Sequence, residues 1–330
     1  MSDNIKGKKI LFIGTNFYDY ENYIISQFES KGAEVFYFSS VVNTLKKRIL
    51  LRLKLRERYI LYLENYISKK IDDLPLDIDF IFVIKAENLK ESHFMQLKAK
   101  YPKVPKVLYL WDSINNLDNT DLLLSQFDSI LSFDREDVLR YNFIFRPLFY
   151  REEDSTFSGE IDYDISFVGG NHSIRYDLIK EIRCVLDQNK VKYKFCLVVG
   201  KFDYLLGLLS GKYRIKDRDL FVTHKVSYEE YMSIGRRSNV ILDISNPFQT
   251  GLTIRTIETI GLKKKLLTTN KDICNYNFPV SFYEVIDSNK PILNISFLKD
   301  SFDDDLDTSK YSCESFIQDI VNSFYSIKGS

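Results

Sequence analysis

Short apolar segments rich in β-branched and aromatic residues alternate with longer amphipathic segments in the first half of the chain. The apolar segments cover residues 9–13, 34–38, 80–84, 106–110 and 129–132. This alternation is typical of βαβ units that form a parallel sheet. It constrains the fold more than any other feature of the sequence, because it predicts a Rossmann-like domain over residues 1–150.

The same alternation starts again after a polar, turn-rich segment, REEDSTFSGEIDY, which predicts a domain boundary. A predicted strand over residues 164–168 ends in Gly169 and Gly170, and a helix is expected over residues 173–188. Further strands are predicted near residues 194–199, 220–223, 240–244, 265–268 and 282–286. We expect a second Rossmann-like domain over residues 151–330, closed by a helix at its C-terminal end.

The chain carries no net charge, since 46 Lys and Arg balance 46 Asp and Glu. Dedicated nucleic-acid binders carry a strong positive charge, so we expect no nucleic-acid partner. The 4 cysteines form no CxxC pair, and the first apolar run is too short for a signal sequence or a membrane span. We therefore expect a cytoplasmic protein.

The loop after the first predicted strand, IGTNFYDYE, has a single glycine and lacks the dinucleotide fingerprint. Gly14 and Thr15 still allow a ligand to approach the backbone closely. Asp19 or Glu21 is placed to serve as a base. The alternative is a glycine that only makes the turn, followed by solvated acids at a helix N-terminus.

The loop FVGGNHSIR lies between a predicted strand and a predicted helix. Gly169, Gly170 and Asn171 offer N–H groups at the helix start, and the guanidinium of Arg175 lies nearby. This combination predicts a phosphate site. His172 is a candidate ligand or acid, but the chain has 3 histidines and no HExxH motif, so we expect no metal site.

The segment SNPFQTGLTIRTIETIG joins a predicted buried strand to a helix on which Arg255 and Glu258 share one face. Near the helix N-terminus, Glu258 can accept both hydroxyls of a ribose. The expected donors to a diphosphate are Gln249, Thr250, Gly251 and Arg255. The alternative is a surface salt bridge between Arg255 and Glu258, worth about 0.5 kcal/mol or less.

The second half also carries a family resemblance, in the segments DISFVGGNHSIRYDLI, VSYEEYMSIGRRSNVILDIS and GLTIRTIETIGLKKKLLTTN. Over residues 164–290 the chain resembles bacterial GT-B glycosyltransferases of surface-polysaccharide synthesis, in the group that includes CgeB-like proteins. The resemblance implies an α/β fold of the GT-B class, with two Rossmann-like doubly wound domains that face each other across a cleft. It also implies a nucleotide-sugar donor in the C-terminal domain, bound as a substrate, with no cofactor.

In the same family pattern, Glu258 matches the acid that binds the ribose, and Arg255, Gly169 and Gly170 match positions near the diphosphate. One position departs from the pattern, because no acid stands seven or eight residues before Glu258. The resemblance therefore does not carry the contact of this second acid over to this chain.

The first domain is expected to bind the acceptor, a glycan or lipid-linked glycan of capsule, O-antigen or lipopolysaccharide. Asp112 and Trp111 follow the predicted strand 106–110, which places a carboxylate beside a ring suited to a sugar face. Asp112 is the first choice of catalytic base in an inverting enzyme and Asp19 the second, whereas a retaining enzyme can operate without a base. The alternative is that Trp111 packs in the core and Asp112 caps a helix.

The D-x-D pairs at residues 77–79, 162–164 and 217–219 precede predicted strands instead of following them. They are therefore expected at the wrong end of each sheet for a metal-bound diphosphate. We expect a metal-independent transferase in which Arg255 and nearby lysines neutralise the leaving diphosphate.

Residues 46–58 contain seven basic residues and one acidic residue, interleaved with leucine and isoleucine. The segment could meet the anionic inner face of the plasma membrane as a basic amphipathic element. One alternative is that the segment forms the solvated face of a long helix. The alternation of apolar and basic residues is also compatible with a β-strand.

The sequence thus predicts a glycosyltransferase that moves a sugar from a nucleotide-sugar donor to a surface polysaccharide. The alternatives are a nucleotide-sugar epimerase of GT-B architecture and a non-catalytic glycan- or nucleotide-binding protein.

Overall fold

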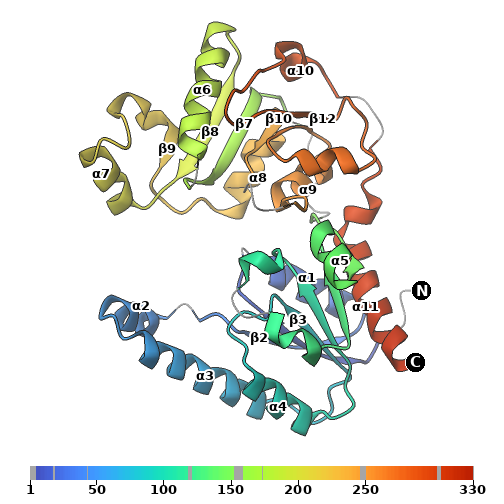
Figure 1. The fold of residues 1–330 in the computed structure, drawn as a ribbon. Helices are drawn as coiled ribbons and strands as arrows, with labels where there is room; N and C mark the ends of the chain where they lie inside the picture. Colours follow the sequence, from blue (N-terminus) through green and yellow to red (C-terminus); the bar gives the residue numbers. More distant parts are fainter. Residues whose placement is uncertain are drawn as a thin grey trace. The chain divides into compact units, whose positions relative to one another are not determined.

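The structure is a computed structural model that describes residues 5–17, 19–42, 44–117, 121–151, 159–172, 174–245, 250–302 and 306–329. The chain divides into two compact units (Figure 1). The first unit contains Met1–Leu148 and Cys313–Ser330, and the second contains Phe149–Ser312.

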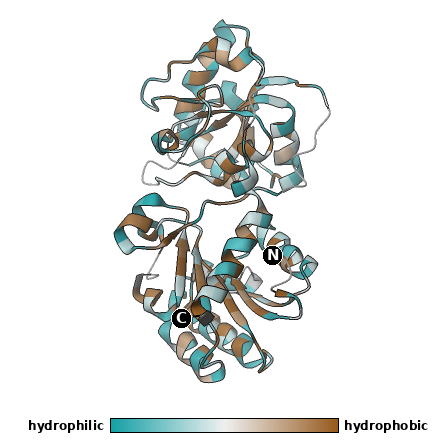
Figure 2. Cartoon of the chain, turned by 90° about the vertical axis from the view of Figure 1, so that its right-hand side faces the viewer, coloured by the Kyte–Doolittle hydropathy of each residue, from teal (hydrophilic) through white to brown (hydrophobic). Residues whose placement is uncertain are grey.

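A six-stranded parallel sheet forms the centre of the first unit. In sheet order its strands are β2 (Glu34–Ser39), β1 (Lys9–Gly14), β3 (Phe80–Ile84), β4 (Lys106–Leu110), β5 (Ser129–Ser132) and β6 (Ile144–Phe145). The strand β3 has the sequence FIFVI and is buried along its whole length, as expected for a parallel strand covered on both faces. Figure 2 colours the chain by hydropathy and shows hydrophobic brown along strands of the unit that contains the two termini. All the strands predicted for this half are present, and β6 is additional.

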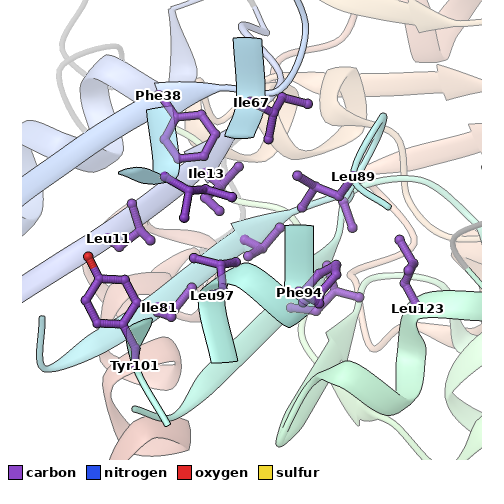
Figure 3. Close-up of a cluster of buried hydrophobic side chains, with 14 of the residues drawn as sticks. Leu11, Ile13, Phe38, Ile67, Ile81, Leu89, Phe94, Leu97, Tyr101 and Leu123 are labelled. Atoms are coloured by element: carbon purple, nitrogen blue, oxygen red, sulfur yellow. The ribbon is translucent and has the colours of Figure 1, made fainter. Parts of the chain in front are cut away.

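The helices of the first unit are α1 (Tyr20–Ser30), α2 (Leu45–Arg52), α3 (Arg56–Asp72), α4 (Glu91–Lys100), α5 (Arg135–Tyr141) and α11 (Cys313–Gly329), with the short 3-10 helices η2 (Ile114–Asn116) and η3 (Asp121–Gln126). Figure 3 shows part of the core, in which Ile67 of α3 and Leu97 of α4 belong to one buried cluster with Ile81 of β3. The apolar faces of these helices therefore cover one side of the sheet.

The second unit also contains a parallel sheet of six strands. In sheet order they are β12 (Tyr283–Val285), β11 (Lys265–Thr268), β10 (Ser238–Asp243), β7 (Tyr163–Gly170), β8 (Tyr193–Val198) and β9 (Phe221–Val222). The chain begins in the middle with β7, continues outward through β8 and β9, and returns to the other side of β7 with β10. This order confirms the predicted doubly wound α/β architecture.

The helices of the second unit are α6 (Arg175–Gln188), α7 (Lys201–Leu209), α8 (Tyr228–Arg236), α9 (Ile254–Gly261) and α10 (Ile295–Lys299), with the 3-10 helices η5 (Ile215–Leu220), η6 (Lys271–Asn275) and η7 (Ser309–Tyr311). Helix α6 buries Ile179, Ile182 and Leu186, whose spacing gives one apolar face. Within the described part of the chain, no helix combines the length and apolar character needed to span a membrane.

The C-terminal helix α11 belongs to the first unit, whereas the sequence predicts that it closes the second domain. The ring of Phe324 stacks on Phe80 of β3 at 4.5 Å between ring centres, and that of Phe316 lies 4.8 Å from Tyr109 of β4. The chain returns to the first unit where Tyr150 N–H donates to Tyr311 O at 2.9 Å. The apolar face of α11 indicates a helix from the sequence, but the aromatic partners that bind it are on distant strands.

We predict that Phe316→Ala lowers the free energy of unfolding of the first unit by about 3–5 kcal/mol, because it leaves a cavity against β3 and β4. Denaturant titration of the full chain measures this change. Leu139→Ala is the control, since Leu139 is 84% exposed on α5. Equal unfolding midpoints for the two variants would contradict the packing of α11 on the first sheet.

Candidate functional site

The carboxyl ends of β7 and β10 are neighbours in the second sheet. From β7 the strand order proceeds toward β8, and from β10 it proceeds toward β11 on the opposite side. Ligands of doubly wound sheets bind at such a reversal of strand order. The topology therefore points to the loops after β7 and β10, which are the loops of this half in which the sequence predicts donor-binding residues.

Arg175 is the first residue of α6 and bonds to the ends of both strands. Its terminal nitrogens donate to the carbonyl oxygens of Gly170 and Ile244, both at 2.9 Å. Burial and the positive charge of Arg255 lower the pKa of Arg175 to about 10, so the group remains a cation at neutral pH. A half-buried cation beside a second cation is a favourable place for an anion.

Arg255, in the first turn of α9, bonds to the same strand ends. It donates to the carbonyl oxygen of Val168 at 2.7 Å and to the carboxylate of Asp243 at 3.2 Å. Asp243 also accepts from the hydroxyl of Thr268 at 3.1 Å. Burial alone would lower the pKa of Arg255. Its neighbours Tyr231, Asp243 and Glu258 outweigh this effect and raise the pKa.

Phe167 and Gly169 lie between the two guanidinium groups. The guanidinium carbons of Arg255 and Arg175 lie 4.8 and 5.6 Å from the centre of the Phe167 ring. A Cβ added to Gly169 would lie 2.8 Å from Nη2 of Arg255 and 3.5 Å from Nη1 of Arg175. A larger residue at this position would therefore displace the guanidinium of Arg255.

Both guanidinium groups keep hydrogen-bond donors for a ligand. A guanidinium has about five N–H donors in a planar fork that matches phosphate oxygens, and the bonds given above use only some of them. The buried Nε atoms of Arg175 and Arg255 have no hydrogen-bond partner among the described residues. Two fixed cations with remaining donors can neutralise the charge of a diphosphate.

Asn171 and His172 extend this site along the loop after β7. The side-chain amide of Asn171 donates to the hydroxyl of Tyr213 at 2.8 Å. Burial, Arg175 and Arg255 all lower the pKa of His172, so its ring is neutral at pH 7. A neutral ring adds a hydrogen-bonding group to the site without adding charge.

The loop before α9, predicted to bind the nucleotide-sugar, lies only partly within the residues that the structure describes. Gly251 is buried, and its carbonyl accepts from the side chain of Asn270 at 3.0 Å. Thr250 is half-buried, and Gln249 lies outside the described residues. The hydroxyl of Thr253 caps α9 by accepting from the N–H of residue 256 at 3.2 Å.

Glu258, expected to contact a ribose, lies inside the second unit. The residue is 4% exposed, and its carboxylate accepts a hydrogen bond from the hydroxyl of Tyr231 on α8. Glu258, Tyr231 and Arg255 are among the residues around a cavity of about 10 Å³, roughly the space of one water molecule. Burial and the charge of Glu258 raise the pKa of Tyr231, which keeps the phenol protonated as the donor.

In the first unit, the carboxylate of Glu21 fills the loop after β1. It accepts from the backbone N–H groups of Thr15, Asn16 and Phe17 at 2.5, 2.8 and 2.9 Å. A Cβ on Gly14 would lie 2.6 Å from its Oε1. Amides that would suit an anion therefore hold the chain's own carboxylate. Gly14 and Thr15 belong to a different unit from the arginine pair, and Glu21 has a structural role.

Asp112, the first choice of base, forms an ion pair with Lys85, which follows β3. Its side chain remains 33% exposed. Trp111 is buried, and its ring centre lies 5.7 Å from that of Phe17 and 5.5 Å from that of Tyr20. The alternative that Trp111 packs in the core is therefore confirmed. The side chain of Asp112 remains partly exposed to solvent. The sequence analysis missed Lys85.

Asp19, the second choice of base, is an exposed residue in the left-handed region with a φ of 67°. Its carboxylate accepts from the side-chain amide of Asn22. Asp134 caps α5, because its carboxylate accepts from the N–H groups of Glu136 and Asp137.

The loops after β1 and β3 contain a cluster of unusual backbone angles. Positive φ angles between 55° and 67° occur at Asn16, Asp19, Lys85, Ala86 and Asn88. Such angles are costly for residues other than glycine and gather at functional sites. The order of the first sheet also reverses between β1 and β3, so these loops form a second candidate location.

Metal ligands do not gather in the part of the chain that the structure describes: it contains no group of three or more His, Cys, Asp or Glu side chains placed to hold an ion. The predicted D-x-D acids form ion pairs instead. Asp79 pairs with Lys8, and Asp217 pairs with Arg183.

No protein-family model matches the sequence, and no curated protein matches it either. Solved structures do match. The chain is similar to OtsA, with a TM-score of 0.62 and 12% identity over 96% of this chain and 99% of that chain. It is also similar to an alpha-glucosyltransferase in complex with UDP and a 13-mer DNA, with a TM-score of 0.56 and 12% identity over 95% and 99% of the two chains.

A third similar structure is the UDP-GlcNAc 2-epimerase of Methanocaldococcus jannaschii in complex with UDP-GlcNAc and UDP. Its TM-score is 0.55, with 10% identity over 96% of this chain and 99% of that chain. At these identities the likeness concerns the fold. The two six-stranded parallel sheets with flanking helices form the GT-B fold, which confirms the predicted fold class.

We predict that Tyr231→Phe destabilises the second unit by about 1–3 kcal/mol, because it leaves the carboxylate of Glu258 buried without this donor. Thermal unfolding of the full chain measures the loss. Tyr204→Phe is the control, since it keeps a half-buried ring that stacks on Tyr213. A Tyr231→Phe variant as stable as the wild type would show that Glu258 does not depend on this bond.

Proposed function

We propose that this protein is a metal-independent glycosyltransferase that moves a sugar from a nucleotide-sugar donor to a surface polysaccharide. The observation that carries the proposal is the pair of guanidinium groups around Gly169 at the strand reversal of the second sheet. Structures with this fold include one solved with UDP and one solved with UDP-GlcNAc, which supports a nucleotide-sugar ligand.

The second unit would bind the donor through its diphosphate. Arg175 and Arg255 supply the positive charge that a metal ion supplies in other transferases, and Gly169 and Gly170 let the diphosphate approach the end of β7. Asn171 and Thr250, with Gly251 and Gln249, would contact the rest of the nucleotide-sugar. The buried position of Glu258 means that a ribose contact requires the Tyr231 bond to open.

The first unit would bind the acceptor, a glycan or lipid-linked glycan of capsule, O-antigen or lipopolysaccharide. In an inverting transfer the acceptor hydroxyl oxygen attacks the anomeric carbon, and its proton passes to Asp112 or, as second choice, Asp19. The bond from the anomeric carbon to the diphosphate oxygen breaks, and the diphosphate keeps the electron pair. The two arginines then stabilise that negative charge. Lys85 fixes the position of the Asp112 carboxylate through the ion pair.

A nucleotide-sugar epimerase is the second candidate, because the fold of the chain is also that of the UDP-GlcNAc 2-epimerase. An epimerase changes the donor sugar without an acceptor, whereas a transferase releases the nucleotide and extends a glycan. Product analysis with and without acceptor separates the two, and a non-catalytic binder would give neither product.

We also propose that the protein works at the cytoplasmic face of the plasma membrane, which it meets through a basic surface on α2 and the start of α3. Lys46 and Lys47 lie over the rings of Tyr62 and Tyr59 at 4.1 and 5.7 Å, so the two helices pack together. Exposed on this surface are Lys46, Ile49, Arg52, Leu53, Lys54, Arg56, Arg58 and Leu61. Cations beside apolar side chains suit an anionic lipid surface.

We predict that one of UDP, GDP, CMP and dTDP raises the melting temperature of the protein, and that Arg175→Gln weakens its binding by at least about tenfold. The reason is the loss of charge-assisted hydrogen bonds worth about 1.5–3 kcal/mol. Calorimetric titration of the stabilising nucleotide gives the affinity. Arg140→Gln, on the exposed side of α5, is the control.

No stabilisation by any nucleotide would overturn the proposed function. Unchanged affinity in the Arg175→Gln variant would overturn the assignment of the phosphate site while leaving nucleotide binding in place.

For the basic surface, we predict that replacing Lys46, Arg52, Lys54 and Arg58 with Gln lowers binding to vesicles of equimolar phosphatidylcholine and phosphatidylglycerol by about a thousandfold, at ~1 kcal/mol per charge. Co-sedimentation measures the binding. The control replaces the exposed lysines 69, 98, 103 and 190. Equal binding by the two variants would refute a specific role for α2 and α3.

A further inference from the structure

Helix α7 exposes an unusual number of large apolar side chains. They are Phe202, Leu205, Leu206 and Leu209, and Ile215, beyond the helix, is exposed as well. Leu209 is 85% exposed and Phe202 is 72% exposed. Single exposed apolar residues are ordinary, but a contiguous group on one short helix marks an interaction surface.

Exposed basic residues stand at the start of this apolar helix and in the segment that follows it. Lys201, Lys212, Arg214, Lys216 and Arg218 are all exposed on α7 and on the segment that follows it. The same stretch contains two acids, of which Asp203 on α7 is exposed, while Asp217 is buried and pairs with Arg183. The exposed charged side chains are thus five basic residues and one acid. The apolar patch therefore has a positive rim, although the chain as a whole is neutral.

The exposed helix is fixed to the unit and is not a loose segment. The ring of Tyr213 lies against Gly207, where an added Cβ would come within 2.2 Å of it. The N–H of Tyr213 donates to Gly207 O at 3.0 Å. Tyr213 also contacts the rings of Tyr176 and Tyr204, at 5.4 and 6.0 Å between centres. The unit thus holds the apolar side chains of α7 in the solvent.

We propose that α7 and residues 210–218, here called the α7 surface, dock on an anionic lipid membrane with the apolar side chains inserted among the acyl chains. A second copy of this chain is a poorer occupant, because a symmetric contact would bring two positive rims together. A lipid surface satisfies both parts of the patch at once, since it buries apolar side chains and neutralises the rim with its headgroups.

The α7 surface lies at the same edge of the sheet as the arginine pair. Helix α7 follows β8, which is next to β7, and Asn171 from the loop after β7 donates to the hydroxyl of Tyr213. Docking of α7 would therefore place the loop that follows Gly170 beside the membrane surface. The docking proposal itself does not depend on the nucleotide-sugar chemistry.

The test uses the full chain with α2 and α3 unchanged, in co-sedimentation with vesicles of equimolar phosphatidylcholine and phosphatidylglycerol. The triple variant Phe202→Ser, Leu205→Ser and Leu209→Ser is expected to bind at least about tenfold more weakly, because apolar side chains no longer insert. The matched control is Leu76→Ser, Met95→Ser and Leu139→Ser, whose apolar side chains are equally exposed elsewhere. Unchanged binding by the α7 variant would overturn the proposal.

A second variant tests the rim. Lys212→Gln, Arg214→Gln and Lys216→Gln together are expected to weaken binding to these vesicles by about hundredfold, and to leave the weak binding to pure phosphatidylcholine unchanged. If the variant lost the same factor in binding to the anionic vesicles and to the pure phosphatidylcholine vesicles, the proposed role of charge would be overturned. Sedimentation of the wild type without lipid gives its oligomeric state, and a dimer that the serine variant dissociates would assign the surface to a second copy instead. Unchanged melting temperatures show that each variant is folded.

Discussion

At the carboxyl ends of β7 and β10, carbonyl oxygens of the strands accept hydrogen bonds from the guanidinium groups of Arg175 and Arg255. These bonds fix two cations against the ends of the strands. The position of the cations depends on the strand order, because only a reversal between β7 and β10 brings the starts of α6 and α9 to one place. Glycine at position 169 and the face of Phe167 complete the arrangement.

The two sheets use their reversal points differently. In the second unit the buried Nε atoms of Arg175 and Arg255 have no hydrogen-bond partner among the described residues, whereas in the first unit Glu21 takes the backbone N–H groups after β1. The first unit therefore carries its own anion at its reversal point, where the second unit presents two cations. For this reason we propose a nucleotide site in the second unit alone.

Much of this could be predicted from the sequence, because periodicity identifies strands and helices locally and loops after parallel strands gather at one edge. This rule explains why Arg175, Arg255 and Gly169 lie close together, although their role as a phosphate site stays a prediction. The burial of Glu258 could not be, since it depends on Tyr231 from another helix, and the partner of Asp112 is a lysine after a different strand. The α7 surface did leave a signal, the run FDYLLGLL. Such a run normally indicates a buried helix, and only the fold shows that it faces solvent.

The path of the chain has a consequence for synthesis. The second unit is inserted into the first, since the chain enters it at Phe149 and leaves it at Ser312, and Tyr150 and Tyr311 join its two ends. Domains usually fold in the order in which the ribosome releases them. Here the second unit is complete while the first still lacks α11, so Phe80 and Tyr109 stay uncovered by that helix until the last part of the chain emerges. The unit that begins first is therefore the one that finishes last.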